Sequence, residues 1–538
     1  MSCVVEIFRK QTISCIALIL LWQHFGFIAA LAQGAENTEP TNFTGSDKSQ
    51  VLTQLATPPA MGAEPSSQIL TSNLPPTNDT AGDAKSPIVS PGPLNEIEEL
   101  DRQIVLQEIM LQKHAINFRR FNNVQGRWKG WRYFLSQEAN NISTASGLLY
   151  GLAERSRIFK HPYILETIID KKGARVVGVL NRPKRSKIEG SLYPQIAGQF
   201  VGAGGSMVEL GINYFHEWQC HKKGYDCKQS VAKVQQYKKN LDQLFDKREV
   251  ILASGMLGKA DTAIERAEGT VLRDITALSL EEYETFHINS RRFRAFQDSI
   301  YLWDVAKNTV GACGNIVQVI GNHEDRPYLT GPAGVLTTIS GALIIIAPLA
   351  ARGWGRLVGD YHKRHLKKEI YGGESCLLTK YDLDRKGLQT MVGEKLVRGE
   401  VVSERATALL ATYEGNALQR ATQVQLAQAE LRAGTRAAQE NVLLGAVVGT
   451  TKVCLGVSNA IAGYGLTTSN HRSNDVIVPG NISYVSGLWL SAAENIRLRV
   501  NDEINRKKLG SQGRLPGQVL AARLKKLDEL ESNLKSVP

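Results

Sequence analysis

The stretch from Pro327 to Ala351 reads PYLTGPAGVLTTISGALIIIAPLAA and contains no charged side chain. A helix needs about 20 apolar residues to cross the hydrocarbon core of a bilayer, so this stretch is long enough. The basic segment RGWGRLVGDYHKRHLKKE follows it directly. The stretch therefore predicts a membrane helix with a basic flank.

Four other runs share this apolar, glycine-rich composition: Gln195–Phe215, Asn308–Gly321, Val442–Asn470 and Val476–Ala493. Glycines recur four residues apart at Gly198 and Gly202 and at Gly445 and Gly449, a spacing that lets two helix backbones approach closely. The alternative is that the runs are buried helices of a large soluble bundle. Glu209 and Lys452 favour that alternative, because a charge inside lipid costs about 3 kcal/mol.

The residues that flank the runs indicate an orientation. Basic residues follow the first, third and fifth runs: Lys222, Lys223 and Lys228; Arg352, Arg356, Lys363, Arg364, Lys367 and Lys368; Arg497, Arg499, Arg506, Lys507 and Lys508. If the runs alternate in direction, these groups share one side of the membrane, as basic cytoplasmic loops do. One basic group opposes this arrangement by preceding the first run: Arg182, Lys184, Arg185 and Lys187.

Aromatic residues at the ends of the runs agree with this arrangement. Trp218, Trp303 and Trp354 fall at ends on the basic side, and Tyr193 and Tyr328 fall at the opposite ends. Amphipathic rings favour the boundary between lipid and water. Five alternating spans would place the C-terminal segment on the inner side.

The beginning of the chain predicts export. Residues 1–32 combine a short basic start, an apolar run and the small-residue sequence Ala30-Leu31-Ala32, which together are typical of a signal peptide cleaved before Gln33. The alternative is an uncleaved anchor. Residues 33–93 are rich in Thr, Ser, Pro, Gly, Asn and Ala without an apolar period, and we expect a disordered linker.

Charged helical segments alternate with the apolar runs: Lys228–Ala277, Glu281–Val305, Glu404–Glu440 and Gln518–Leu534. Apolar residues repeat every seven positions in three series: Ile97, Ile104, Leu111 and Phe118; Leu410, Ala417, Val424, Leu431 and Ala438; Leu520, Leu527 and Leu534. Such a repeat places one apolar stripe on a helix that packs against a neighbour. We expect the first of these helices to begin at Asn95, with Glu98 completing a capping box.

The fold class that follows is mainly all-α, with long helical arms and glycine-rich apolar helical hairpins. One β-hairpin is expected near residues 163–180, because two β-branched runs flank Asp170-Lys171-Lys172-Gly173. We divide the ordered chain into an N-terminal helical segment (94–192), a first hairpin with its arm (193–370), a second arm and hairpin (371–510) and a C-terminal amphipathic helix (511–538). The two hairpins share an Asn-His turn, a proline and a Ser-Gly pair, which suggests a duplicated unit whose second helix starts at Pro332 or Pro479.

Some motifs resemble binding sites but lack the residue spacing that such a site requires. His216 and His221 are five residues apart, which turns the second ring away from the face that a zinc helix needs. Cys220, His221 and Cys227 form a weak metal cluster that lacks a fourth ligand, and the two cysteines could instead pair in an oxidising compartment. Cys313 and Cys454 lie in apolar runs and are expected to be small packing residues.

Two glycine-containing segments resemble phosphate-binding loops. Gly445 to Lys452 lacks the Gly-Lys-Ser/Thr ending and continues a helix, so its backbone N–H groups are not free for phosphate. Gly202 to Gly205 fails in the same way. The remaining candidates are a polar patch of His323, Glu324 and Asp325 with His471, and the pair His362 and His365, for which a solvated face is expected. No catalytic, cofactor-binding or metal-binding residue is predicted, and no cofactor.

The net charge of +12 is interpreted as basic solvated helices, and no nucleic acid partner is expected. The leading hypothesis is a non-enzymatic exported membrane protein of the cell envelope, with a structural, assembly or passage role. Its partners would be membrane lipid and, through the charged arms, itself or another helical protein. The alternative is a soluble secreted or periplasmic helical protein that binds a partner or inserts its apolar hairpins into a target membrane. A hydrolase with an unrecognised site is the third hypothesis.

Overall fold

The computed structural model describes residues 92–122, 127–160, 163–170, 173–180, 184–370, 378–398, 409–413, 415, 442–465 and 470–536. The chain divides into two units, Met1–Gly92 and Pro93–Pro538, and the described helices and strands lie in the second. The predicted signal peptide and nearly all of the predicted linker therefore lie outside the described residues. So does most of the predicted arm Glu404–Glu440.

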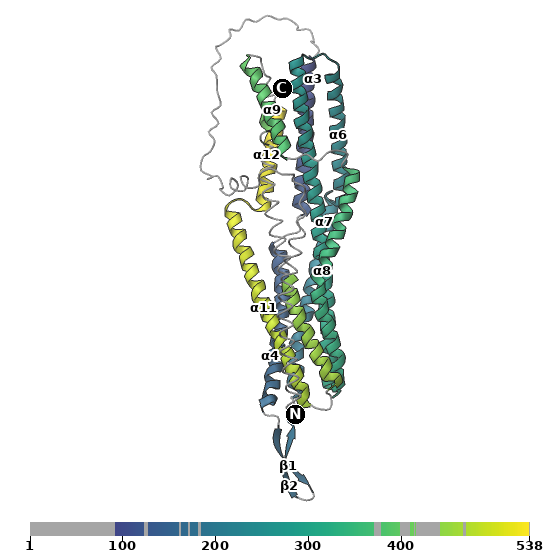
Figure 1. The fold of residues 1–538 in the computed structure, drawn as a ribbon, viewed down its shortest axis with the longest axis vertical. Helices are drawn as coiled ribbons and strands as arrows, with labels where there is room; N and C mark the ends of the chain where they lie inside the picture. The colour runs from purple at the N-terminus through teal and green to yellow at the C-terminus, as the bar shows by residue number, and fades with distance from the viewer. Residues whose placement is uncertain are drawn as a thin grey trace, which may run out of the picture. The chain divides into compact units, whose positions relative to one another are not determined.

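The described part of the second unit is mainly helical, as expected (Figure 1). Its helices are α3 (Pro93–Asn122), α4 (Arg127–Lys160), α5 (Arg185–Lys222), α6 (Cys227–Ala253), α7 (Lys259–His323), α8 (Thr330–Glu369), α9 (Leu378–Val397), the Val442–Gly465 helix, α11 (Asn470–Ser511) and α12 (Pro516–Ser536). A short 3-10 helix, Pro327–Leu329, joins α7 to α8. The fold class predicted from the sequence is confirmed.

The predicted β-hairpin is present between α4 and α5. Strand β1 (Tyr163–Asp170) pairs antiparallel with β2 (Gly173–Leu180), from Tyr163 opposite Leu180 to Asp170 opposite Gly173. The two strands extend beyond the ends of the helices that they connect (Figure 1).

One group of helices packs around an apolar core, and we call it the arm bundle: α3, α6, α9, α12, the first part of α7 and the end of α8. Ile97, Ile104, Leu111 and Phe118 are all 0% exposed, so the seven-residue stripe predicted for α3 is the face that packs. Leu520, Leu527 and Leu534 of α12 are also buried. Two of the three predicted series are therefore confirmed, and the third lies mostly outside the described residues.

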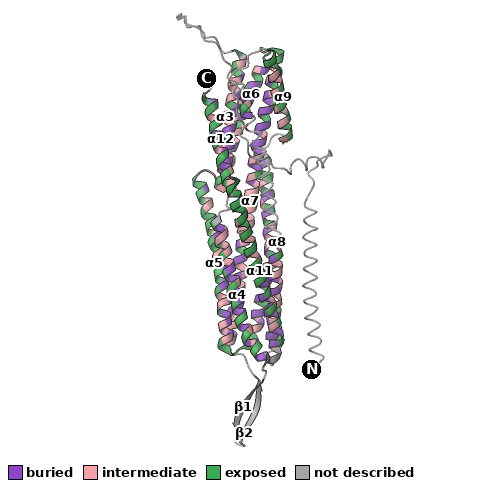
Figure 2. Cartoon of the chain, turned by 90° about the vertical axis from the view of Figure 1, so that its left-hand side faces the viewer, coloured by how far each residue is buried: buried purple, intermediate pink, exposed green. Residues whose placement is uncertain are grey.

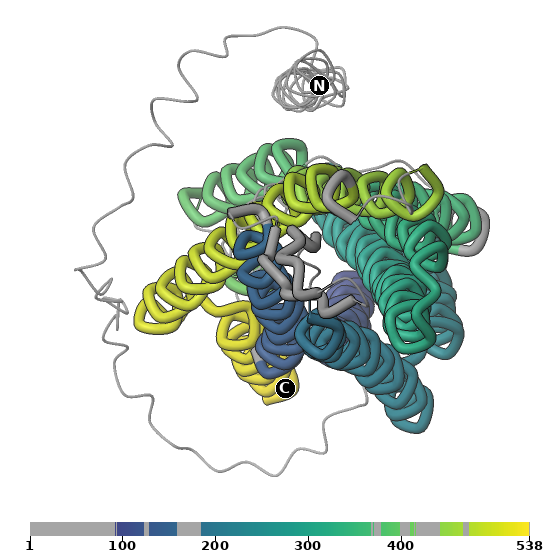
Figure 3. The backbone as a smooth tube through the Cα atoms, turned by 90° about the horizontal axis from the view of Figure 1, so that it is seen from below, coloured from purple at the N-terminus to yellow at the C-terminus, as the bar shows by residue number. Residues whose placement is uncertain are grey.

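The other group consists of six helices that follow one another around a ring: α4, α5, the second part of α7, α8, the Val442–Gly465 helix and α11. Figure 3 views the helices end-on, and the colour sequence follows this order around the ring. Direct contacts join each pair of neighbours: Ser143 to Pro194, Asn213 to Asp298, Lys307 to Ser340, Gly341 to Val453, Thr451 to Gly487, and Asn474 to Arg155. We refer to these helices as the six-helix ring.

Glycines set the contact between α8 and the Val442–Gly465 helix. A Cβ on Gly334 would lie 2.6 Å from the carbonyl O of Gly456, and one on Gly341 would lie 2.9 Å from that of Gly449. Since residue numbers rise along one helix as they fall along the other, the pair is antiparallel. The expected packing role of Gly445 and Gly449 is confirmed, and Gly456 and Gly463 extend the same contact.

Four boundaries differ from those predicted. Helix α3 begins at Pro93 rather than Asn95, because proline suits the first position of a helix. The segment Lys228–Ala277 is interrupted after Ala253, where Gly255 adopts a φ of +68°. The predicted helix Glu281–Val305 and the apolar run Asn308–Gly321 are parts of one helix, α7, since no glycine or proline turn separates them.

The fourth difference concerns the second hairpin. Pro332 lies in the first turn of α8, as expected, whereas Pro479 lies inside α11, which already starts at Asn470. The idea that proline starts the second helix of both hairpins is therefore wrong for the second one. A helix tolerates an internal proline where other groups satisfy the carbonyl that the proline leaves free.

Three described helical segments are long and apolar enough to cross a membrane: Pro327–Leu366, Val442–Gly465 and Ser473–Ser536. The uncharged stretch Pro327–Ala351 lies within the first of these segments. The predicted runs Gln195–Phe215 and Asn308–Gly321 are not among them. The described helices with the length and composition of a membrane span are thus α8, the Val442–Gly465 helix and the segment that begins in α11.

Candidate functional site

Helix α5 buries its polar side chains and exposes its large apolar ones. Its buried face includes six polar residues: Ser191, Gln195, Gln199, Ser206, Glu209 and Asn213. Tyr193, Phe200, Met207 and Tyr214 recur every seven residues on the opposite face, and each is more than half exposed. A helix of a water-soluble bundle has the reverse pattern, with apolar residues facing the core.

Helices α8 and α11 also expose large apolar side chains, and buried and exposed residues alternate along both helices (Figure 2). On α8 the buried Thr337 and Ser340 alternate with exposed Ile339, Ile346 and Leu349. On α11 the exposed face carries Ile482, Trp489, Leu490 and Ile496. Its buried face holds both polar residues and large apolar ones: Asn474, Asn481 and Ser491, and Val476, Ile477, Tyr484, Val485 and Leu488. The six-helix ring therefore has many polar side chains in its interior, beside a small cluster of apolar ones, and large apolar side chains on its exterior.

The two parts of the unit differ in what fills them. The arm bundle contains a cluster of 27 buried hydrophobic residues among those described, whereas the largest such cluster in the six-helix ring has 7. Asn, Gln, Ser and Thr side chains and glycine backbones occupy the remaining space in the ring. Among the described residues, the arm bundle thus has the larger apolar core.

Exposed aromatic residues mark the two ends of the apolar exterior. Tyr193 and Trp218 lie toward opposite ends of α5. Tyr328 lies in the 3-10 helix just before α8, and Trp354 lies on α8 after its apolar part. At a rise of about 1.5 Å per residue, the two rings of each pair are about 38 Å and about 39 Å apart. A bilayer measures about 40–45 Å including its interfacial regions. The spacing of these rings matches the two interfaces where aromatic residues collect in membrane proteins.

A buried lysine lies halfway along the interior. Lys452 is 3% exposed, and it forms no ion pair within the part of the chain that the structure describes. A Cβ on Gly311 would lie 2.9 Å from Gln199 Nε2, 3.0 Å from Lys452 Nζ and 3.1 Å from Ser340 Oγ. The missing side chain of Gly311 lets these three polar groups from three helices converge.

Both charges that favoured a soluble bundle in the sequence face this interior. Glu209 is 1% exposed, and its Oε1 accepts a hydrogen bond of 2.8 Å from Arg132 Nε on α4. Lys452 lies beside Gln199 and Ser340, with its ammonium 5.8 Å from the centroid of the Tyr484 ring. Neither charge contacts the apolar exterior, so the cost of placing a charge in lipid does not apply to them.

Nearer the arm bundle, a group of hydrogen-bonded side chains on α4 and α7 lies in the interior of the ring. The Tyr133 hydroxyl donates to Asp304, whose other carboxylate oxygen pairs with Lys307 at 2.5 Å. Asn140 Nδ2 donates to Asn308 Oδ1 at 3.2 Å. Buried polar side chains thus extend along α5 from Ser191 to Asn213, a rise of about 33 Å, and we call this series the polar axis of the ring. That length is comparable with the roughly 30 Å hydrocarbon core of a bilayer.

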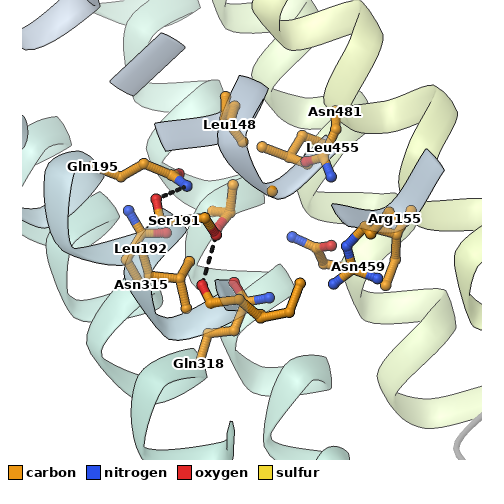
Figure 4. Close-up of a pocket in the computed structure, with 14 residues that line it drawn as sticks. Leu148, Arg155, Ser191, Leu192, Gln195, Asn315, Gln318, Leu455, Asn459 and Asn481 are labelled. Carbon is orange, nitrogen blue, oxygen red and sulfur yellow. Dashed lines mark hydrogen bonds between the residues drawn. The ribbon is translucent and has the colours of Figure 1, made fainter. Parts of the chain in front are cut away.

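A cavity of about 30 Å³ lies on this axis near the hairpin end (Figure 4). All six helices of the ring line it: Leu148, Gly151 and Arg155; Ile188, Ser191, Leu192 and Gln195; Asn315 and Gln318; Thr337; Leu455 and Asn459; Ile477 and Asn481. Arg155 is the one charged residue of this lining. The cavity is large enough for one or two water-sized particles.

The cysteine and histidine cluster singled out in the sequence does not assemble into a site. Cys220 and Cys227 are both free thiols. Cys220 donates to the carbonyl O of Phe121, while Cys227 Sγ accepts from Arg291 Nε at 2.6 Å. His221 faces Asp226 instead, with 2.8 Å between Nδ1 and Oδ2. Burial raises the pKa of the Cys227 thiol to about 11, so it is not a thiolate at neutral pH.

The other motifs also lie in structural positions. Gly445 and Gly449 pack against α8, and Gly202 packs against Asn140 of α4. His323 is exposed at the end of α7, 4.0 Å from Glu189, and the side chain of His471 lies outside the described residues. The His362 ring packs against His287, with 5.6 Å between centroids.

The arm bundle holds a buried charged cluster that the sequence did not indicate. Asp101, Glu265 and Glu268 bring carboxylate oxygens within 4.8 Å of one another, which is close enough to hold a metal ion. Arg248 occupies this position: it donates to Asp101 Oδ1 at 2.6 Å and to Glu265 Oε2 at 2.9 Å. The guanidinium supplies positive charge where a cation would bind, so the residues present form a salt-bridge cluster.

Burial raises the pKa of the carboxyls in this cluster. Desolvation, followed by repulsion from Asp101, raises the pKa of Glu265 to about 7. Desolvation also raises the pKa of Glu268 well above its usual value, and the Tyr413 hydroxyl donates to this carboxyl at 2.7 Å. One arginine thus faces three acidic groups, and the raised pKa values of these carboxyls reduce the excess of negative charge in the cluster.

Comparison of the chain with protein-family models, with curated proteins and with solved structures finds no match. The six-helix ring, with its exposed apolar side chains, its polar axis and the cavity that all six helices line, is therefore the candidate functional site.

Proposed function

We propose that this protein is an exported integral membrane protein of the cell envelope, and that its six-helix ring passes small hydrophilic solutes across the lipid. The observation that carries the proposal is the inverted polarity of the ring, which has Gln199, Ser206 and Asn213 inside and Phe200, Met207 and Tyr214 outside. Polar side chains add nothing to apolar packing, but their hydrogen bonds replace those of water around a hydrophilic solute. The cavity volume of about 30 Å³ limits that solute to a small one.

The competing hypothesis is a soluble secreted or periplasmic helical protein. It requires the outward faces of α5, α8 and α11 to remain in water, although contiguous apolar patches on soluble monomers rarely exceed a few hundred Å². Extraction of membranes with alkaline carbonate separates the two hypotheses. We expect the protein to stay in the membrane fraction until detergent is added. Its release by carbonate alone would exclude a spanning ring.

The passage role is tested by reconstituting the full-length protein in liposomes and following solute entry by stopped-flow light scattering. We expect wild-type protein to raise the permeability to urea, glycerol or sodium chloride several-fold over protein-free liposomes. The variant Gly311→Val should return it close to the protein-free value, because the new side chain enters the space that Gln199, Lys452 and Ser340 share.

The matched control is Gly211→Val on α5. Gly211 is exposed and no atom lies within 4 Å of the position of its Cβ, so this variant adds the same side chain outside the ring. It should leave permeability unchanged. If wild-type liposomes are no more permeable than protein-free ones to every solute tried, the passage role is wrong.

A further inference from the structure

The cavity at the hairpin end of the six-helix ring has a cationic lining. Of its 14 lining residues Arg155 alone carries a charge, and the lining includes seven amide or hydroxyl side chains from the other helices: Ser191, Gln195, Asn315, Gln318, Thr337, Asn459 and Asn481. The Arg155 Nη1 donates to Asn474 Oδ1, a neutral acceptor, at 2.6 Å. The charge of the guanidinium is therefore not balanced by a carboxylate in the cavity.

The nearest acidic residue in the sequence is engaged elsewhere. Glu154 pairs with Arg157 at 2.8 Å and with Lys187 at 3.3 Å, and it accepts from the backbone N–H of Lys184 at 3.2 Å. Of the other buried carboxyls of the ring, Glu209 is held by Arg132 and Asp304 by Lys307. Glu138 is hydrogen-bonded to Asn141 and Asn495, about 25 Å away along α4.

A second observation points to an occupant of the cavity. Asn459 is 5% exposed, and its Oδ1 has no hydrogen-bond partner among the described residues although it is buried. A buried amide oxygen without a donor costs about 1–3 kcal/mol. In Figure 4 the Asn459 and Arg155 side chains lie next to each other on one side of the cavity. The cavity thus presents an unbalanced cation beside an acceptor that needs a donor.

We propose that this cavity binds a small inorganic anion, of the size of chloride or bromide, together with one water molecule. The anion accepts hydrogen bonds from the Arg155 guanidinium, and the water donates one hydrogen to the anion and the other to Asn459 Oδ1. The cavity of about 30 Å³ has room for one or two particles of this size, and the pair satisfies both groups. This inference rests on the proposed function, because it names the class of solute that the ring carries.

A second basic residue, Lys452, lies on the polar axis away from the cavity. Lys452 precedes Asn459 by seven positions on the same helix, which places it about 10 Å further along the same face. Lys452 also lies among neutral groups, Gln199 and Ser340, rather than beside a carboxylate. Two basic residues inside the ring, Arg155 in the cavity lining and Lys452 further along the axis, favour anions over cations.

Thermal unfolding of the full-length protein in detergent tests the site without measuring passage. Sodium chloride and sodium bromide are compared with sodium gluconate at equal ionic strength, since gluconate is too large for the cavity. A ligand that binds the folded state raises the unfolding midpoint. We expect a rise with chloride and with bromide that saturates, and no such rise with gluconate.

Two variants locate the effect. Arg155→Gln should lose the saturable rise because it removes the cation. Asn459→Asp should lose it as well, and should remain folded, because its carboxylate pairs with Arg155 in place of the anion. The control Arg157→Gln removes an adjacent, exposed arginine and should keep the response.

The outcomes separate this inference from the proposed function. If both cavity variants respond to chloride as the wild type does, or if the wild type does not respond, the anion site is wrong even where liposomes are permeable to urea or glycerol. If the saturable response is present and depends on Arg155 while no solute crosses the liposomes, the site stands and the passage role is wrong.

Discussion

Arg248 is the most deeply buried large side chain of the arm bundle that carries a charge. It is 1% exposed, and it contacts Asp101 on α3 and Glu265 on α7. Burying a guanidinium without a partner costs several kcal/mol, so the acidic residues are required for packing at this point. They exceed the single positive charge, and Glu268 and Glu265 therefore retain protons at pH values where an exposed glutamate is ionised.

Replacement of Glu265 by glutamine tests this account. The pKa of Glu265 is about 7 in the folded protein and lies near 4.5 in an exposed glutamate. Its protonated form is thus favoured by folding, and the stability that it contributes is present below pH 4.5 and is lost as the pH rises through 7. We expect Glu265→Gln to match wild type at pH 5 and to be more stable by roughly 1–3 kcal/mol at pH 8.

The measurement is the difference in unfolding free energy between wild type and variant from pH 5 to pH 8. Taking the difference removes the opposite contributions of His114 and His287, whose pKa values burial lowers to about 4 and about 3. Glu249→Gln is the control, because Glu249 is half exposed and pairs with Arg273 on the surface. A Glu265 difference that stays constant with pH would contradict a raised pKa.

Single residues show what the sequence could indicate and what it could not. Ile97, Ile104, Leu111 and Phe118 were placed correctly because their period alone defines a packing face. Glu209 and Lys452 indicated helices that are buried against others, and both side chains are buried, but the sequence did not show which helices they face. The Asp101–Arg248 pair joins residues 147 positions apart, and no local pattern connects them.

At the scale of elements, the contact between α8 and the Val442–Gly465 helix depends on the absence of side chains. Gly334, Gly341, Gly449 and Gly456 bring the two backbones together along the ring. Without a hydrophobic force between helices in lipid, such close packing is a main source of association. The glycines therefore act as the interface rather than as points of flexibility.

Two alanine variants should shift stability in opposite directions. A Cβ on Gly456 would lie 2.8 Å from the carbonyl O of Gly334, so Gly456→Ala must separate the helices and should destabilise the folded protein by roughly 1–3 kcal/mol. Gly353→Ala on α8 meets no atom within 4 Å and should instead stabilise by up to about 1 kcal/mol through helix propensity. Thermal unfolding in detergent measures both. Equal effects of the two substitutions would contradict a close-packed interface.

Most helices and the β-hairpin could be predicted from the sequence, but the positions at which one helix ends and the next begins could not. The β-hairpin, α12 and the apolar helices follow from residue patterns that act over a few turns. The break after Ala253 and the continuity of α7 through Asn308 were missed, because a change in composition was interpreted as the end of a helix. The inward stripe of Gln199, Ser206 and Asn213 was visible at a spacing of seven, but the glycines of the same run were taken as its packing signal.

At the scale of the whole unit, two kinds of bundle share one pair of helices. Helices α7 and α8 pass from the arm bundle, which has an apolar core, into the six-helix ring, which has a polar one. This change in polarity along the same helices is expected if, as proposed, the arm bundle lies in water and the ring in lipid. Ring closure and the shared cavity depend on contacts such as that of Arg155 on α4 with Asn474 on α11, 319 positions apart, which the sequence alone did not reveal.

The central claim is that the exterior of the six-helix ring faces lipid. It is tested most directly by nitroxide labels placed singly at Tyr193, Phe200, Met207 and Tyr214 of α5, in protein whose native cysteines are replaced, after reconstitution in bilayers. Collision rates are measured with oxygen, which concentrates in lipid, and with a water-soluble nickel chelate. We expect oxygen collisions to be highest at positions 200 and 207 and chelate collisions to be highest at 193 and 214. High chelate collision rates at all four positions would show that this face lies in water and would contradict the account.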